Sequence, residues 1–189
     1  VGLGGRVGGS LREAVETGLA RRFGPGKWIE AWLPPQVYLN RALARTRRVD
    51  PARLEKEASA LLLKQPGVAR VYTRRRLEGG PPPEQDPWFI RVARGFDPQR
   101  SGDLHVLLKP FWLFSSERGT THGSPYEYDT HVPLILSGPG IRPGVYYQSA
   151  EIVDVAPTLA VLLGMEFPTW RDGRVLTEVL TDLPFQDNQ

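Results

Sequence analysis

The 189-residue sequence contains no cysteine, only three histidines, and no long unbroken run of apolar residues. Without cysteine there can be no disulfide and no thiolate metal site, so a metal would have to be bound through His, Asp or Glu. Because no apolar run approaches about 18 residues and no basic leader precedes a shorter run, neither a transmembrane helix nor a signal peptide is predicted. The lack of cysteine does not identify the compartment, since such chains occur in both cytosol and periplasm.

Hydrophobic residues make up 40% of the chain and aromatic residues 10%. This content is enough for one domain with a core, or for a core lobe plus a small accessory lobe. The 18 prolines and 20 glycines predict many turns and long loops.

Charge is distributed unevenly along the chain. Residues 1–100 carry 19 Lys and Arg against 10 Asp and Glu, a net +9, whereas residues 101–189 carry 5 against 11, a net −6. A basic half can attract nucleic acid, through the arginines at 45, 47 and 48 and at 74–76. No nucleic-acid-binding motif or base-stacking platform accompanies these arginines, so solvated helix ends and loops are the favoured interpretation.

The first hundred residues predict alternating helices and strands. Ser10 and Glu13 have the spacing of a capping box at the start of a helix that ends near Phe23. Strands are predicted over 28–32, 37–39 and 68–73, and Asp50-Pro51 predicts the start of a helix that ends near residue 66. A further short helix is predicted over 88–95, as an apolar lid over this sheet. Residues 36–73 therefore predict a small α+β lobe.

The remaining residues predict core elements of an α/β fold. The apolar runs 104–109 and 132–136 predict two buried strands, which we expect in a sheet separate from that of the α+β lobe. Asp154 is placed to cap a helix over 155–163 that stops at Gly164, and 173–180 predicts a last short helix. The aromatic cluster 111–114 is expected to fill core.

Residue types and spacing suggest chemistry in one stretch, residues 119–137. His122 stands between Thr121 and Gly123, on a loop whose glycines allow close approach to an ion, so its imidazole can serve as a metal ligand. On spacing alone, a turn residue remains the alternative. Asp129 is either an acceptor for an imidazole N–H or a plain turn residue. His105 and His131 are interpreted as structural.

Residues 119–141, GTTHGSPYEYDTHVPLILSGPGI, resemble the last metal-binding motif of the alkaline phosphatase superfamily. The resemblance is to phosphate-irrepressible alkaline phosphatases, which are grouped with type I phosphodiesterases and nucleotide pyrophosphatases. Residues 152–168, IVDVAPTLAVLLGMEFP, resemble the segment that closes the core domain. The resemblance implies zinc-dependent hydrolysis of phosphate esters, with two zinc ions held by Asp and His and a Thr or Ser alkoxide as nucleophile. Only His122 matches a metal ligand, that of the leaving-group zinc, and no catalytic or other cofactor-binding residue is matched.

The superfamily's nucleophile motif and its Asp-x-x-x-His and Asp-His-Gly ligand pairs are absent from the sequence. Because residues 1–6 resemble the segment directly after the Asp-His-Gly pair, we expect a C-terminal portion of such an enzyme. We divide it into a core helix and connection (1–29), an α+β accessory lobe (30–100) and a C-terminal α/β core segment (101–189). The resemblance also implies export to the periplasm or secretion.

This chain alone is expected to bind no zinc, to be inactive and to self-associate through surfaces that a truncated core exposes. No membrane or nucleic-acid partner is expected. One alternative is a stand-alone interaction or nucleic-acid-binding module that uses the basic first part. Another keeps the superfamily but changes the chemistry to that of a sulfatase or a phosphomutase. The preference for phosphate monoesters or diesters is left open.

Overall fold

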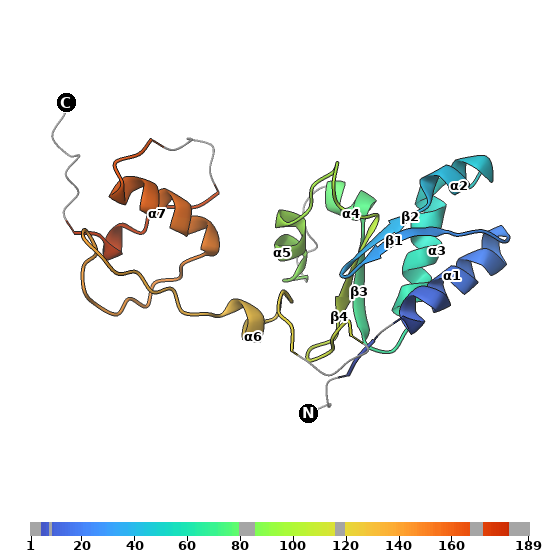
Figure 1. The fold of residues 1–189 in the computed structure, drawn as a ribbon, viewed down its shortest axis with the longest axis horizontal. Coiled ribbons are helices and arrows are strands. Elements are labelled where there is room, and N and C mark those ends of the chain that lie inside the picture. Colours follow the sequence, from blue (N-terminus) through green and yellow to red (C-terminus); the bar gives the residue numbers. More distant parts are fainter. Residues whose placement is uncertain (1–4, 8, 80–85, 116–119, 167–171, 182–189) are drawn as a thin grey trace. The chain divides into compact units, whose positions relative to one another are not determined.

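The computed structural model describes residues 5–7, 9–79, 86–115, 120–166 and 172–181 (Figure 1). The chain divides into two units, residues 1–131 and 132–189. The boundaries expected after residues 29 and 100 stay a prediction for the complete protein. No helix among the described residues is both long and apolar enough to cross a membrane.

The first unit is built on one antiparallel sheet with the strand order β1-β2-β4-β3. Its strands are β1 (Ile29–Leu33), β2 (Gln36–Leu39), β3 (Val68–Thr73) and β4 (Leu104–Leu108). Leu33 pairs with Gln36, so the intervening Pro34 and Pro35 form the turn of a β1–β2 hairpin. The strands predicted near 28–32, 37–39, 68–73 and 104–109 are thus confirmed.

Helices α1 (Ser10–Phe23) and α3 (Pro51–Leu63) cover one face of this sheet, as Figure 1 shows. The main core cluster lies between them and the sheet. Helix α2 (Arg41–Thr46) follows β2 directly. The predicted start of α3 is confirmed, because the Asp50 side chain accepts a hydrogen bond from the Ala52 amide at 2.8 Å.

The capping box predicted for Ser10 and Glu13 is wrong. Helix α1 already begins at Ser10, and Gly9 is its N-cap. The Glu13 amide is instead bonded to the Gly9 carbonyl oxygen at 3.2 Å. A serine inside the first turn cannot cap the amides that follow the N-cap position.

The opposite face of the sheet is covered by the short helix α5 (Phe89–Arg94), which confirms the predicted lid. A second apolar cluster of Tyr72, Phe89, Val92, Leu107 and Tyr126 fills this side. Helix α4 (Arg74–Glu78) follows β3. Since α5 lies on one side of the sheet and α3 on the other, the central strands are buried on both faces.

The predicted separation of β4 from the other strands is wrong, because β4 pairs with both β2 and β3. Its apolar run suits a central strand: Leu104, Val106 and Leu108 enter the main cluster, whereas Leu107 enters the second. Asp103, which is buried, accepts a hydrogen bond from the Leu39 amide at 2.7 Å and so joins β4 to the end of β2.

The second unit contains η1 (Ile152–Asp154), α7 (Val155–Leu162) and η2 (Thr177–Val179). The helix predicted over 173–180 is therefore only the single turn of η2. Asp154 is buried, and its carboxylate accepts the amides of Glu151 and Arg174, each at 2.8 Å. Asp154 thus caps η1 and binds the segment around Arg174. Its side chain makes no cap hydrogen bond to α7, so the predicted role as the cap of that helix is wrong. Gly164, at φ 63°, ends α7 as predicted.

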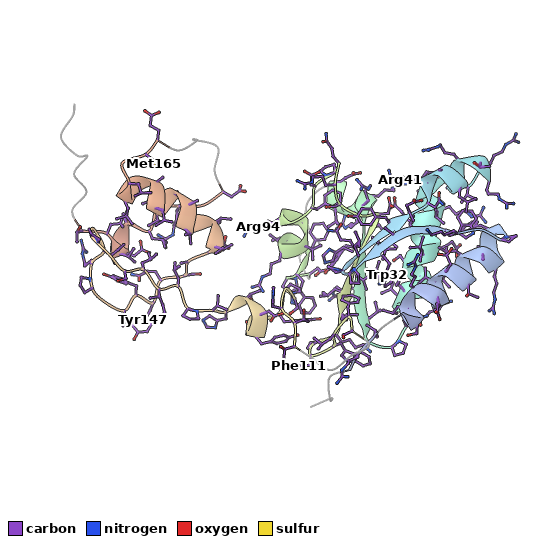
Figure 2. All side chains as sticks on the ribbon, viewed as in Figure 1. Trp32, Arg41, Arg94, Phe111, Tyr147 and Met165 are labelled. Atoms are coloured by element: carbon purple, nitrogen blue, oxygen red, sulfur yellow. The ribbon has the colours of Figure 1, made fainter. Side chains whose placement is uncertain are left out.

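The strand predicted over 132–136 is also wrong. These residues form no strand, and Val132 and Ile135 are 66% and 83% exposed. A strand needs a neighbour for its backbone hydrogen bonds, and the described part of the second unit contains just one isolated bridge, between Ile141 and Leu180. Figure 2 draws the side chains of this unit, with Tyr147 and Met165 labelled among its exposed residues.

Candidate functional site: a histidine loop beside a cavity

The histidine of interest lies on a loop of the first unit that ends in the single turn α6 (Glu127–Thr130). His122 is exposed, and the next residue, Gly123, has φ 98°, a left-handed conformation that glycine adopts without strain. The loop is closed on itself by Asp129, which accepts a hydrogen bond from the Ser124 amide at 2.8 Å. The turn role considered for Asp129 is therefore observed, and its role as an acceptor for an imidazole N–H stays a prediction.

Side chains from the sheet and from α5 fix this loop in place. The Tyr126 hydroxyl donates a buried hydrogen bond to the Leu108 carbonyl oxygen at 2.6 Å, which ties the loop to the end of β4. Arg91 of α5 donates to the Pro125 carbonyl and, at 2.9 Å, to the Thr130 hydroxyl. The loop that carries His122 is thus held by long-range contacts to two separate elements.

A cavity of about 580 Å³ opens beside the loop, entirely within the first unit. Its walls combine the turn of the β1–β2 hairpin, one strand, the aromatic segment after that strand, and the histidine loop. The lining residues are Pro34 and Pro35, residues 105–108, 111–114 and 120–125, Tyr128 and Asp129. His122 therefore shares one cavity with a largely apolar wall.

The aromatic segment after β4 is divided between core and cavity. Trp112 and Phe114 pack against the main core cluster, as predicted for the whole segment. Phe111 does not, because its side chain is 57% exposed and stacks on Tyr128 with ring centroids 4.8 Å apart. The Phe111 amide also donates to the Tyr128 hydroxyl at 3.0 Å. Core filling is thus corrected for Phe111, which Figure 2 labels.

Two titratable groups of the cavity wall are perturbed. Burial lowers the pKa of His105 to about 4, so its imidazole is uncharged at neutral pH. This agrees with the structural role expected for His105 on β4. Hydrogen bonding from Ser124 lowers the pKa of the Asp129 carboxyl, and nearby His122 lowers it further. Asp129 therefore stays ionised beside the histidine at neutral pH.

The described residues do not form a complete metal site by themselves. No group of three or more His, Cys, Asp or Glu side chains suited to a metal occurs in the part of the chain that the structure describes. His122 presents an exposed imidazole, which is a normal ligand for zinc. His131 lies at the C-terminal end of α6 and is not among the residues that line the cavity.

No protein-family profile matches the chain. Alkaline phosphatase PafA of Elizabethkingia meningoseptica is 31% identical over 171 residues, which are 90% of this chain and 31% of that protein. A crystal structure of alkaline phosphatase PafA superposes with a TM-score of 0.84 at 30% identity, covering 94% of this chain and 34% of the other. The chain belongs to the alkaline phosphatase superfamily.

A protein of Myroides odoratus named calcium-transporting ATPase is also 31% identical, over 173 residues, 90% of this chain and 31% of its own length. The chain spans about a third of the length of these relatives. Sulfatases match shorter stretches, such as a choline-sulfatase of Rhizobium meliloti at 38% identity over 72 residues. The mixed helix and strand fold expected from the sequence is confirmed by the superposition on PafA.

Sequence reasoning missed the residues that build the cavity around His122. The sequence predicts Phe111 in the core with its neighbours and indicates no role for Arg91 at the loop. Tyr126 and Tyr128 lie in the recognised motif, but nothing in their spacing shows that one enters the core while the other stacks on Phe111. No local signal distinguishes these roles, because each depends on a residue far away in the sequence.

Proposed function

We propose that this chain is part of a metal-dependent hydrolase of phosphate esters. The similarity to alkaline phosphatases along most of the chain carries the proposal. Four proteins named alkaline phosphatase match 90%, 77%, 87% and 74% of the chain, whereas the sulfatases match 41%, 32% and 34%. This difference favours phosphate over sulfate esters as substrates. Some of the arginines that suggested nucleic acid make hydrogen bonds within the chain, as when the largely buried Arg74 donates to the Ser101 carbonyl oxygen.

Within that enzyme, His122 is proposed as a zinc ligand on the side of the leaving group. Its exposed imidazole and its firmly anchored loop support this role, since metal ligands must be held in a fixed orientation. The other ligands are proposed to come from elsewhere in the complete protein, because the described residues contain no group of three or more side chains suited to hold a metal. The bound metal would stabilise charge on the leaving oxygen and activate water.

The residues of this chain have three tasks in the proposed mechanism. His122 offers an imidazole nitrogen, Asp129 closes the loop through the Ser124 amide, and Tyr126 fixes the loop to β4. None of them is proposed as the nucleophile. This 189-residue chain by itself is therefore expected to turn over no phosphate ester, because a catalytic zinc site needs about three protein ligands.

The test is His122→Ala in the complete protein, with His131→Ala, an exposed histidine nine positions along the same loop, as the matched control. We expect His122→Ala to lose bound zinc and to hydrolyse nitrophenyl phosphate at least about tenfold more slowly, and His131→Ala to resemble wild type. Full zinc content and a near-normal rate in His122→Ala would refute the ligand assignment. Zinc-dependent turnover by the 189-residue chain alone would refute the ligand count.

A further inference from the structure

One wall of the cavity beside His122 is aromatic. The rings of Phe111 and Tyr128 are 57% and 49% exposed, although each is large enough to stabilise a core by burial. They lie nearly parallel, with an interplanar angle of 19°. Tyr128 also stacks on Tyr126, with centroids 5.7 Å apart, and Tyr126 is bonded to the end of β4. The exposed stack is thus fixed to the sheet.

Phe111 is held toward the cavity in a strained conformation. Its φ of 64° lies in the left-handed region, which bulky residues rarely adopt. The next residue, Trp112, turns inward and fills the space beside Gly5, where a Cβ would lie 2.7 Å from its ring. The Tyr128 hydroxyl accepts the Phe111 amide and so holds the outward turn in place. Strain that the surroundings maintain is characteristic of functional sites.

The size and chemistry of the cavity fit a planar apolar group. Its volume of about 580 Å³ lies within the usual range of small-molecule sites. Pro34 and Pro35 line it from the hairpin, and the uncharged imidazole of His105 lines it from β4. The same cavity reaches Thr121 and His122. An ester whose aromatic group stacks on Phe111 would therefore have its phosphate-bearing end close to His122.

We infer that this cavity binds the aromatic leaving group of an aryl phosphate, with Phe111 and Tyr128 as the stacking surface. The inference rests on the proposed function for its phosphate end and adds the class of leaving group. Under this inference Phe111 determines specificity, because an aryl phosphate gains binding energy from stacking on its ring. A small alkyl phosphate has no ring to stack and gains none.

Binding of two non-hydrolysable probes to the complete protein tests this inference without requiring turnover. The probes are 4-nitrobenzylphosphonate and methylphosphonate, and dissociation constants are measured by titration NMR. The variant is Phe111→Gly, which removes the ring and also relieves the positive φ, so it is expected to fold at least as well as wild type. The control is Tyr147→Ala, which removes a 93% exposed aromatic side chain from the second unit.

We expect wild type to bind the nitrobenzyl compound more tightly than the methyl compound. Phe111→Gly should raise the dissociation constant of the nitrobenzyl compound by about fivefold or more, as expected for the loss of one aromatic stacking contact. The dissociation constant of the methyl compound should not change. Tyr147→Ala should bind both as wild type does. Equal affinities for the two probes in wild type, or equal nitrobenzyl affinity in wild type and Phe111→Gly, would overturn the inference.

The two proposals fail separately. Phe111-dependent binding of the nitrobenzyl compound, together with a complete protein that has no metal-dependent phosphatase activity, would overturn the proposed function and leave the aromatic site standing. Metal-dependent phosphatase activity with no effect of Phe111→Gly on either probe would overturn only the aromatic site.

Discussion

The hydrogen bond from Tyr126 to β4 gives a sharp test of how the histidine loop is held. Tyr126→Phe removes the hydroxyl that donates to the Leu108 carbonyl oxygen at 2.6 Å, in a side chain that is 7% exposed. The ring contacts with Trp88 and Tyr128 remain, because phenylalanine keeps the ring. The change therefore isolates one buried hydrogen bond and leaves a buried carbonyl oxygen without this donor. Leaving a buried acceptor without its donor lowers the free energy of unfolding by about 1–3 kcal/mol.

We expect the free energy of unfolding of the first unit to fall by about 2 kcal/mol in Tyr126→Phe. The assay is urea denaturation followed by tryptophan fluorescence, in which the fully buried Trp28 reports on this unit. The matched control is Tyr38→Phe, which removes a hydroxyl that contacts the Arg100 carbonyl oxygen at the surface and the Gln36 side-chain oxygen, and should change stability by less than about 0.5 kcal/mol. Equal stability of the two variants would refute the argument that Tyr126 anchors the loop.

Three further predictions concern other parts of the chain. Burial raises the pKa of Glu55 above its usual value, so the folded state holds the proton more tightly and stability falls as pH rises through that pKa. Urea titrations should therefore show Glu55→Gln gaining stability relative to wild type as the pH rises above the usual glutamate pKa of about 4.5, and a difference independent of pH would contradict this. In the second unit, a Cβ at Gly173 would overlap the Val153 carbonyl oxygen. Gly173→Ala should therefore destabilise this unit by about 1–3 kcal/mol and speed amide hydrogen exchange in α7. Unchanged exchange rates would contradict this, because they would mean that the backbone can shift to accommodate the Cβ. Ile135, 83% exposed in an apolar run, should promote self-association, and Ile135→Lys should reduce the sedimenting mass of the isolated chain if wild type is oligomeric; a monomeric wild type would contradict this.

Local chemistry explains which elements the sequence predicted well. The start of α3 depends on Asp50 and Pro51 alone, because a cap bonds to amides only a few positions away. The end of α7 depends on Gly164, since a left-handed residue after the last turn is a local requirement. Pro34 and Pro35 likewise mark the break between the two apolar runs that form β1 and β2.

Non-local pairing explains the errors. The apolar runs 104–108 and 132–136 look alike in sequence, yet the first is the central strand β4 and the second forms no strand. The difference is whether a neighbouring strand is available, as β2 and β3 are for β4. Burial and hydrogen bonding of a strand depend on its neighbours, so composition alone cannot separate the two cases.

For the site, the sequence by itself determined the donor chemistry: a cysteine-free chain, a histidine on a glycine-containing loop, and a motif typical of the alkaline phosphatase superfamily. The tertiary structure alone decided what surrounds that histidine. Arg91 anchors the loop by hydrogen bonds to residues 34 and 39 positions later in the chain, and Tyr126 anchors it by a hydrogen bond to a residue 18 positions earlier. Trp112 packs against the core, whereas the neighbouring Phe111 lines the cavity. These arrangements result from contacts between distant segments, whose geometry exists only once the sheet and its covering helices have packed together.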